Sequence, residues 1–185
     1  MCGISGIILK KINENLVLEF LQHANSIQKN RGPDAQDFMI QNDKNEQSFY
    51  SQGIRSSAGP ILGLAHQRLS IIDLNKRSNQ PMIGHGGKYV LCYNGEIYNF
   101  RILKKQLQRL GYNFRTTSDT EVVLYAMIEW GMEAPNKFVG MFAFSFLNND
   151  TGKMLLVRDR IGIKPLHYIS NEACFAFSSE LHTLA

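Results

Sequence analysis

The order of strand-like and helical patterns along the chain constrains its fold more than any other feature of the sequence. Strand-like runs dominate the first 93 residues apart from one amphipathic helix, two helical patterns follow, and strand-like runs return from residue 140. Strands grouped in this way, without a helix between each pair, favour antiparallel sheets over βαβ units. The sequence therefore predicts an α+β fold in which helices cover layered sheets.

The expected elements follow from hydrophobic spacing and from local start and stop signals. Apolar residues at helical spacing predict a helix over 15–29, and the run Arg31-Gly32-Pro33-Asp34 ends it. Asn99 is the expected N-cap of a second helix, and Ser118 with Glu121 is an expected capping box for a third. Strands are expected at 3–9, 36–41, 47–52, 61–66, 88–93, 140–147, 154–158, 166–169 and 173–178.

Composition bounds the class of protein. The chain has 185 residues, 44% of them hydrophobic and 19% charged, which suits one domain, 1–185, with its own core. A net charge of +4 does not by itself mark a nucleic-acid binder, and no apolar run reaches the roughly 20 residues of a membrane span. Three widely spaced cysteines argue against disulfides and against a metal site. We therefore expect a cytoplasmic protein without a secretory signal.

Cys2 is the residue with the strongest chemical signal. If Met1 is removed, Cys2 carries both a thiol and a free α-amine, and the amine can accept the thiol proton near neutral pH. Nucleophile and base are then joined covalently, which supplies proximity without a separate histidine. This pair suits acyl transfer from an amide through a thioester. A cysteine near the N-terminus is by itself more often incidental, so the prediction depends on other residues.

These residues supply the remaining requirements of an acyl-transfer site. Asn94 and Gly95 follow a strand, so a side-chain amide and a backbone N–H could stabilise an oxyanion. The alternative is a plain Asn-Gly hairpin turn, and both can hold. Arg68 could bind a substrate carboxylate. Asp119, helped by Glu96, could bind an ammonium group, although the helix dipole alone also favours an acidic residue in a first turn.

Nine short motifs follow one another along the chain. They are MCGISG at 1–6, RGPD at 31–34, HQRLSI at 66–71, QPM at 80–82, YNGEIYN at 93–99, SDTE at 118–121, GMFAF at 140–144, RDRIGIKPL at 158–166 and FSSE at 177–180. Each is weak singly. In this order they resemble the class II, N-terminal-nucleophile glutamine amidotransferases, and most of all the glutaminase domain of glutamine-hydrolysing asparagine synthetases.

The resemblance implies a role for each matching residue. Cys2 would be the nucleophile with its own α-amine as the base, and Asn94 with Gly95 would form the oxyanion hole. Arg68 would bind the α-carboxylate of L-glutamine, and Arg31 would lie beside the nucleophile strand. The remaining substrate contacts would come from the main chain of Leu69 and Ile71 and from the carboxylates of Glu96 and Asp119, which would bind the α-ammonium group.

The resemblance also implies an Ntn-hydrolase fold, a four-layer αββα sandwich of two antiparallel sheets, with no cofactor in this domain. Asparagine synthetases continue into an ATP-dependent synthetase domain, whose SGGxDS pyrophosphate loop has no match in this sequence. ATP and Mg are therefore expected only in that absent domain. The chain is expected to pass ammonia to a synthetase domain or subunit, for asparagine synthesis from aspartate, and a homodimer is compatible with this role.

Two alternatives stay open. Aminosugar and phosphoribosyl amidotransferases belong to the same class, and an acceptor in a surface-polysaccharide pathway is a further option, but RGPD together with NGEIYN favours asparagine synthetases. A non-catalytic or regulatory module with the same fold would result if Met1 is retained, because an amide nitrogen cannot act as the base.

Overall fold

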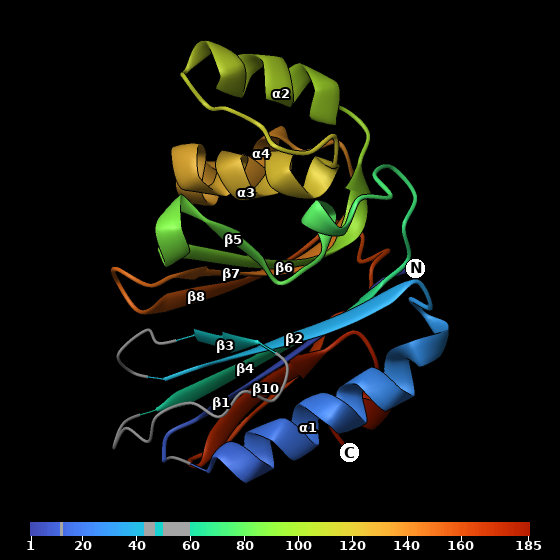
Figure 1. The fold of residues 1–185 in the computed structure, drawn as a ribbon, viewed down its shortest axis with the longest axis vertical. Coiled ribbons are helices and arrows are strands. Elements are labelled where there is room, and N and C mark those ends of the chain that lie inside the picture. Colours follow the sequence, from blue (N-terminus) through green and yellow to red (C-terminus); the bar gives the residue numbers. More distant parts are fainter. Residues whose placement is uncertain (12, 43–46, 50–59) are drawn as a thin grey trace. The chain divides into compact units, whose positions relative to one another are not determined.

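In each of two compact units of the chain, helices pack on an antiparallel sheet, as the computed structural model shows (Figure 1). The structure describes residues 1–11, 13–42, 47–49 and 60–185. The first unit comprises Met1–Leu69 and Pro165–Ala185, and the second comprises Ser70–Lys164. The two antiparallel sheets and their helices confirm the predicted α+β class.

The sheet of the first unit contains six strands among the described residues. Their order is β3 (Gln47–Phe49), β2 (Ala35–Gln41), β4 (Ile61–Arg68), β1 (Gly3–Leu9), β10 (Cys174–Ser178) and β9 (His167–Ser170). Strand β1 lies between β4 and β10, with Ser5 opposite both Ala65 and Ser178. Cys2 directly precedes this strand, which is paired on both sides.

Helix α1 (Glu14–Ile27) covers this sheet and continues into the short helix η1 (Gln28–Asn30) (Figure 1). Val17, Leu21 and Ala24 are its fully buried apolar residues, and they pack against the apolar residues of β1 and β4. Gly63 permits this close approach, because a Cβ at that position would lie 2.6 Å from Val17 Cγ1 and 3.0 Å from Leu21 Cδ1. The helix predicted over 15–29 is therefore confirmed.

The sheet of the second unit has the order β5 (Met82–Gly84), β6 (Tyr89–Ile97), β7 (Gly140–Asn148) and β8 (Lys153–Arg158). Helix α3 (Asp119–Trp130) contacts β5 and β6 on one side and α2 (Phe100–Arg109) on the other (Figure 1). Every residue of α3 from Asp119 to Met127 is buried, because the helix is enclosed from both sides. The short helix α4 (Ala134–Lys137) follows α3.

Short 3₁₀ helices connect several of these elements: η2 (Lys76–Ser78), η3 (His85–Gly87), η4 (Gly131–Glu133) and η5 (Leu181–Thr183). Most strand predictions are confirmed to within two residues at each end, although β6 extends four residues beyond its predicted end. Residues 50–52 of the predicted strand 47–52 lie outside the described residues. Among the described helices, none is long and apolar enough to cross a membrane.

One turn prediction is wrong, and one cap prediction is confirmed in position only. Asn94 and Gly95 do not form a turn but lie within β6, opposite Ala143 and Phe142 of β7. Pairing with β7 runs through this dipeptide to Ile97, so the long-range ladder overrides the local turn preference. Asn99 is the N-cap residue of α2, as predicted, but its side chain makes no capping hydrogen bond to the helix.

Candidate active site

The predicted site residues fall into two groups, one in each unit. Cys2, Arg68 and Leu69 belong to the first unit. The second unit contains Ile71, Asn94, Gly95, Glu96 and Asp119. Each group is built by the contacts within its own unit.

In the first unit, the Cys2 thiol meets the main chain of Leu69. The Leu69 N–H donates to Cys2 Sγ at 3.4 Å, and Cys2 Sγ donates to the Leu69 carbonyl at 3.6 Å. The β1–β4 register, with Gly3 opposite Gln67, brings the residue before β1 to the residues after β4. Two residues that are 67 positions apart in the sequence are therefore juxtaposed by strand pairing alone.

The RGPD segment at 31–34 fastens both of these strand ends. Arg31 Nε donates to the Cys2 carbonyl at 3.1 Å, and the Asp34 N–H donates to the Arg68 carbonyl at 3.0 Å. Pro33 forms an isolated bridge with Arg68. Gly32 packs so closely that a Cβ would overlap the backbone of Gln67. The motif therefore needs a glycine at its second position for a steric reason.

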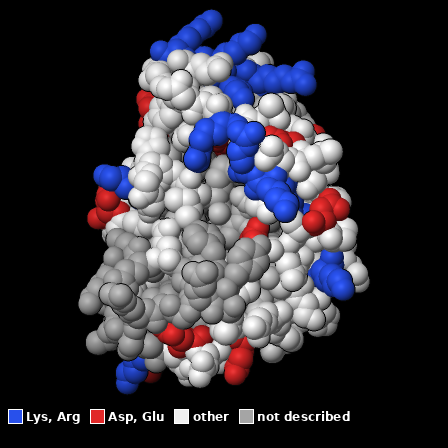
Figure 2. Space-filling view, viewed as in Figure 1, with Lys and Arg blue, Asp and Glu red and all other residues white. Residues whose placement is uncertain are grey.

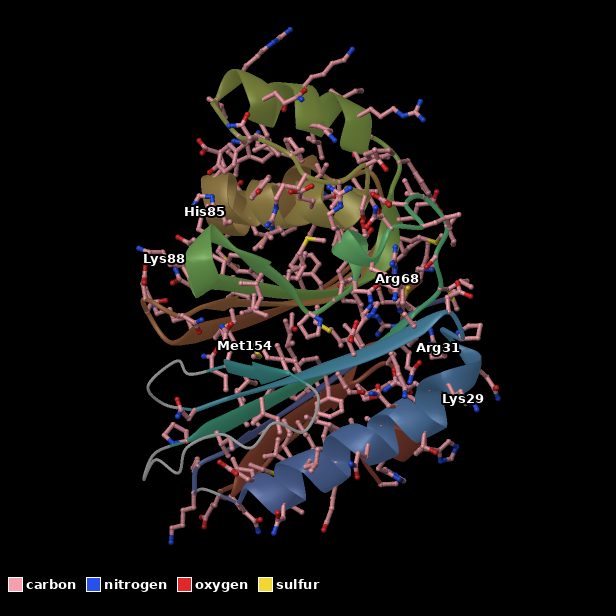
Figure 3. All side chains as sticks on the ribbon, in the orientation of Figure 1. Lys29, Arg31, Arg68, His85, Lys88 and Met154 are labelled. Carbon is pink, nitrogen blue, oxygen red and sulfur yellow. The ribbon has the colours of Figure 1, made fainter. Side chains whose placement is uncertain are left out.

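Arg68 is the last residue of β4 and directly precedes Leu69, the residue that contacts the thiol. Its side chain is only 7% exposed. Figure 3 labels Arg31 and Arg68, which come from the same end of the first unit. A guanidinium has the charge and the planar donor fork that suit binding of a carboxylate.

In the second unit, Asn94 is buried in β6, with 1% of its surface exposed. Its Nδ2 atom has no hydrogen-bond partner among the residues that the structure describes. An unpaired buried donor costs about 1–3 kcal/mol, so proteins usually pair such groups. The neighbouring Gly95 lies against β7, where a Cβ would come within 2.5 Å of the Met141 carbonyl oxygen. The buried Nδ2 of Asn94, unpartnered among the described residues, is therefore suited to donate to an oxyanion.

Asp119 is the first residue of α3 and is 5% exposed. Its Oδ2 accepts the Tyr93 hydroxyl at 2.7 Å and the Ile97 N–H at 3.1 Å. Burial raises the pKa of Asp119, and the charge of Glu96 adds to this effect, whereas the bonds from Tyr93 and Ile97 oppose it. The carboxylate is thus bonded to β6 on both sides of Asn94, and its charge is repelled by Glu96. A cationic substrate group would relieve that repulsion.

The loop before α3 is braced by two further carboxylates. Glu121 accepts the Thr116 N–H and the Thr116 hydroxyl, each at 2.7 Å. Only half of the predicted capping box is therefore present. The Ser118 side chain accepts the Thr120 N–H, but Glu121 binds Thr116 instead of the Ser118 N–H. Glu121 therefore stabilises the loop before α3 rather than the first turn of the helix.

Asp73 connects the segment after Ser70 to this same loop. Its Oδ2 accepts the Thr117 N–H at 2.9 Å and the Thr117 hydroxyl at 3.0 Å, and its Oδ1 accepts the Asn75 N–H at 2.8 Å. Burial raises the pKa of Asp73, but these bonds outweigh it and lower the pKa to about 2. The predicted substrate residue Ile71 lies two positions before Asp73, and its side chain is 71% exposed.

Sequence reasoning did not single out three residues that shape these groups: Tyr93, Asp73 and Glu180. Tyr93 begins the motif that contains Asn94, so that motif was the available signal, whereas Asp73 lies two residues after the motif that contains Arg68. Glu180 ends the FSSE motif, but nothing local indicates that it pairs with Arg31, which lies 149 positions earlier.

Helix α2 carries a group of exposed basic side chains. Figure 2 shows Lys and Arg side chains gathered where α2 lies, and Arg101, Lys105 and Arg109 are its exposed basic residues. Lys104 donates to the Thr116 carbonyl at 2.9 Å. In the described part of the chain, no group of three or more His, Cys, Asp or Glu side chains could hold a metal ion.

Comparison with solved structures shows the fold. Glutamine phosphoribosylpyrophosphate amidotransferase from Bacillus subtilis matches 99% of this chain and 43% of its own, with a TM-score of 0.74 and 20% sequence identity. A structure described as the allosteric regulatory enzyme of purine biosynthesis matches over the same shares, with a TM-score of 0.71. The chain therefore has an amidotransferase fold of the class that its motifs indicated.

Comparison of sequences shows the family. Residues 50–185 match the family model described as a glutamine amidotransferase domain. Asparagine synthetase 2 of Bacillus subtilis is 33% identical over 100% of this chain and 22% of its own length. Asparagine synthetase B of Escherichia coli is 34% identical over 90% of this chain and 26% of its own length. The chain belongs to the class II glutamine amidotransferase domain family, and it spans only a part of the length of these glutamine-hydrolysing asparagine synthetases.

Proposed function

We propose that this domain hydrolyses L-glutamine to L-glutamate and ammonia through a thioester on Cys2. With Met1 removed, the α-amine of Cys2 accepts the thiol proton while sulfur attacks the carboxamide carbon of glutamine. The tetrahedral intermediate collapses as the resulting ammonium returns the proton to the leaving nitrogen, which departs as ammonia. Water, deprotonated by the same amine, then adds to the thioester, and cleavage of the carbon–sulfur bond releases glutamate and restores the thiol.

The unpaired Nδ2 of Asn94 is the observation that supports this reaction most. A tetrahedral oxyanion needs donors that are in place before it forms, in a site that excludes water. Asn94 Nδ2 is buried and has no hydrogen-bond partner among the described residues. The donor is therefore already desolvated, and it gains a hydrogen bond only when an acceptor binds. The backbone N–H of Gly95 is the second proposed donor.

We propose that oppositely charged side chains bind the α-carboxylate and the α-ammonium group of glutamine. The guanidinium of Arg68 binds the α-carboxylate, and the carboxylates of Asp119 and Glu96 bind the α-ammonium group. Burial and the neighbouring Glu96 charge both disfavour ionised Asp119, so a bound ammonium stabilises the pair. The main chain of Leu69 and Ile71 completes the proposed contacts.

The ammonia acceptor is proposed from the relatives. They are asparagine synthetases that are several times longer than this chain, so we propose a synthetase domain or subunit that makes asparagine from aspartate with ATP and Mg. The glutaminase reaction itself is proposed to need no cofactor. None of the described residues Cys2, Cys92 and Cys174 forms a disulfide, which is compatible with the proposed cytoplasmic location. A homodimer, and the lack of nucleic-acid and membrane partners, stay predictions.

Glutamate formation tests the proposed hydrolysis. Protein whose intact mass proves the loss of Met1 is incubated with glutamine, alongside Cys2→Ala and the matched control Cys174→Ala. Wild type and Cys174→Ala should form glutamate, and Cys2→Ala should not. Wild type that forms no more glutamate than Cys2→Ala, even with a relative's synthetase domain present, contradicts hydrolysis and favours the non-catalytic module.

Isotope transfer tests the acceptor. Glutamine labelled with ¹⁵N in its carboxamide is supplied with aspartate, ATP, Mg and a synthetase domain that is active with ammonium chloride. Label should appear in asparagine above the level produced by the same amount of free ¹⁵N-ammonia. Label that appears only in ammonia, while hydrolysis proceeds, would exclude this acceptor and leave the hydrolysis proposal intact.

A further inference from the structure

Cys2 is held by its carbonyl group as well as by its thiol. Arg31 Nε donates to the Cys2 carbonyl at 3.1 Å, and Arg31 Nη1 forms an ion pair with Glu180 Oε1 at 2.5 Å. The Arg31 side chain is 15% exposed and that of Glu180 is 33% exposed. The orientation of the guanidinium at Cys2 is therefore set by a carboxylate from the other end of the chain.

Glu180 is itself held in place by buried bonds. Its N–H donates to Ser178 Oγ at 3.0 Å. Ser178 Oγ also accepts the Ser5 hydroxyl at 2.9 Å and Gln28 Nε2 at 3.1 Å, and all three of these side chains are buried. Glu180 therefore extends from a buried polar cluster (Ser5, Gln28 and Ser178) rather than from a loose surface loop.

Ser179 connects this segment directly to the strand of the nucleophile. The Ser179 N–H donates to the Ile4 carbonyl at 2.8 Å, and the Ile4 N–H donates to Ser179 Oγ at 3.1 Å. The contacts form a closed ring: the chain leads from Cys2 through Gly3 to Ile4, hydrogen bonds join Ile4 to Ser179, Ser179 is joined covalently to Glu180, and Glu180 is linked through Arg31 back to Cys2. A ring of this kind holds the first residues of β1 in a single position.

We propose that Glu180 is a positioning residue for Cys2 and acts through Arg31. The inference rests on the proposed role of Cys2 as the nucleophile. Without the carboxylate, the guanidinium is free to adopt other rotamers, and the Cys2 carbonyl loses a charge-assisted hydrogen bond. A nucleophile at a chain terminus depends on such bonds, because it has covalent neighbours on one side only once Met1 is removed.

The test uses the full chain with Met1 removed and compares Glu180→Gln with Asp150→Asn. The control variant also replaces an acid by its amide in an ion pair, the exposed Lys88–Asp150 pair at 3.2 Å. We expect Glu180→Gln to lower kcat for glutamine about tenfold, with KM changed less than about twofold, because substrate contacts remain while the nucleophile is misplaced. Asp150→Asn should change neither constant.

A thermodynamic cycle shows whether Glu180 acts through Arg31. In an Arg31→Lys background, adding Glu180→Gln should lower kcat by less than about a further twofold, because the Arg31–Glu180 pair is already disrupted. If Glu180 acts independently of Arg31, the kcat reduction of the double variant should instead equal the product of the two single reductions. That outcome would overturn the proposal. Glu180→Asp, which keeps the charge on a shorter side chain, replaces Glu180→Gln if the latter does not fold.

Alkylation separates this inference from the proposed reaction. The rate at which iodoacetamide labels Cys2 is measured from the mass of the Cys2 peptide, in a Cys174→Ala background. This measurement needs no glutamine. Release of the Cys2 carbonyl should loosen the contact with Leu69 and raise the labelling rate about threefold or more in Glu180→Gln, at an unchanged melting temperature. Equal labelling in Glu180→Gln and Asp150→Asn would overturn the positioning role. Absence of glutamate from the wild type would contradict only the hydrolysis.

Discussion

Tyr93 donates its hydroxyl to Oδ2 of Asp119 over 2.7 Å, and both side chains are buried. The same carboxylate oxygen accepts the Ile97 N–H at 3.1 Å. Asp119 therefore bonds to β6 on both sides of the segment from Asn94 to Glu96. A carboxylate anchored in this way is held in one orientation, so the proposed ammonium-binding group and the proposed oxyanion donor are parts of one rigid arrangement.

Replacing Asp119 by Asn should weaken glutamine binding. The proposed ion pair with the α-ammonium group is lost, and hydrogen bonds to charged groups contribute about 1.5–3 kcal/mol, so KM should rise about 10–100-fold. Steady-state kinetics measure this change. Glu129→Gln is the matched control, because Glu129 accepts the Tyr112 hydroxyl at 2.9 Å in the same unit. Equal KM values for the two variants would argue against ammonium binding by Asp119.

The raised pKa of Asp119 predicts an acid limit to glutamine binding. An ordinary aspartate stays ionised down to about its usual pKa of 3.8, but burial and the Glu96 charge favour protonated Asp119 at higher pH. The protonated form cannot pair with an ammonium group, so KM should rise as pH falls, beginning above 3.8. A KM profile from neutral to acid pH measures this dependence. A flat profile in the wild type, matching that of Asp119→Asn, would contradict it.

Replacing Asn94 by Ala should separate activity from stability. Loss of one oxyanion donor lowers kcat about 10²–10³-fold in comparable sites. Nδ2 has no partner to lose among the described residues, so the melting temperature should stay nearly unchanged. Asn99→Ala is the control, since Asn99 donates to the Lys137 carbonyl and accepts the Val139 N–H. It should lower the melting temperature and keep kcat, and the opposite pattern would remove Asn94 from the proposed oxyanion hole.

Replacing Gly95 by Ala should destabilise the second unit. The new Cβ would lie 2.5 Å from the Met141 carbonyl oxygen and 2.8 Å from the Phe142 Cα, and these backbone atoms cannot move without breaking the β6–β7 ladder. We expect a loss of about 2–4 kcal/mol in the free energy of unfolding. Gly152→Ala, at φ +65° with nothing within 4 Å, should cost only about 1 kcal/mol. Urea denaturation that gives equal losses would refute the steric argument.

Replacing Asp73 by Asn should remove an acid-dependent part of the stability. The folded-state pKa of Asp73 is lowered from 3.8 to about 2, so its ionised form stabilises the fold above pH 3.8, and this contribution is lost as pH falls toward 2. Because the side chain is partly exposed to solvent, we expect a loss of only about 1 kcal/mol at pH 7. Denaturation at pH 7 and pH 2 should show a gap between wild type and variant that closes at the lower pH. A gap that persists at pH 2 would assign the effect to packing.

Much of the fold follows from patterns that are local in the sequence. Helix α1 begins where Asn13 caps it and buries Val17, Leu21 and Ala24, which recur at helical spacing. Local spacing could not predict that Asn94-Gly95 would continue a strand, because its pairing partner lies almost 50 residues later in β7. Nor could it predict the bond between Glu121 and Thr116, which replaces the Glu121 half of the expected capping box.

The sequence by itself determined the α+β class and the family, and it supplied the residues proposed for the site, among them Cys2, Arg68, Asn94 and Asp119. Only the tertiary structure decided which of these residues touch: Cys2 with Leu69, Asp119 with Tyr93, and Arg31 with Glu180. The physical reason is one of range. Periodicity and caps act within one or two turns of chain, whereas each of these contacts forms only after strands or helices distant in sequence have paired and buried them.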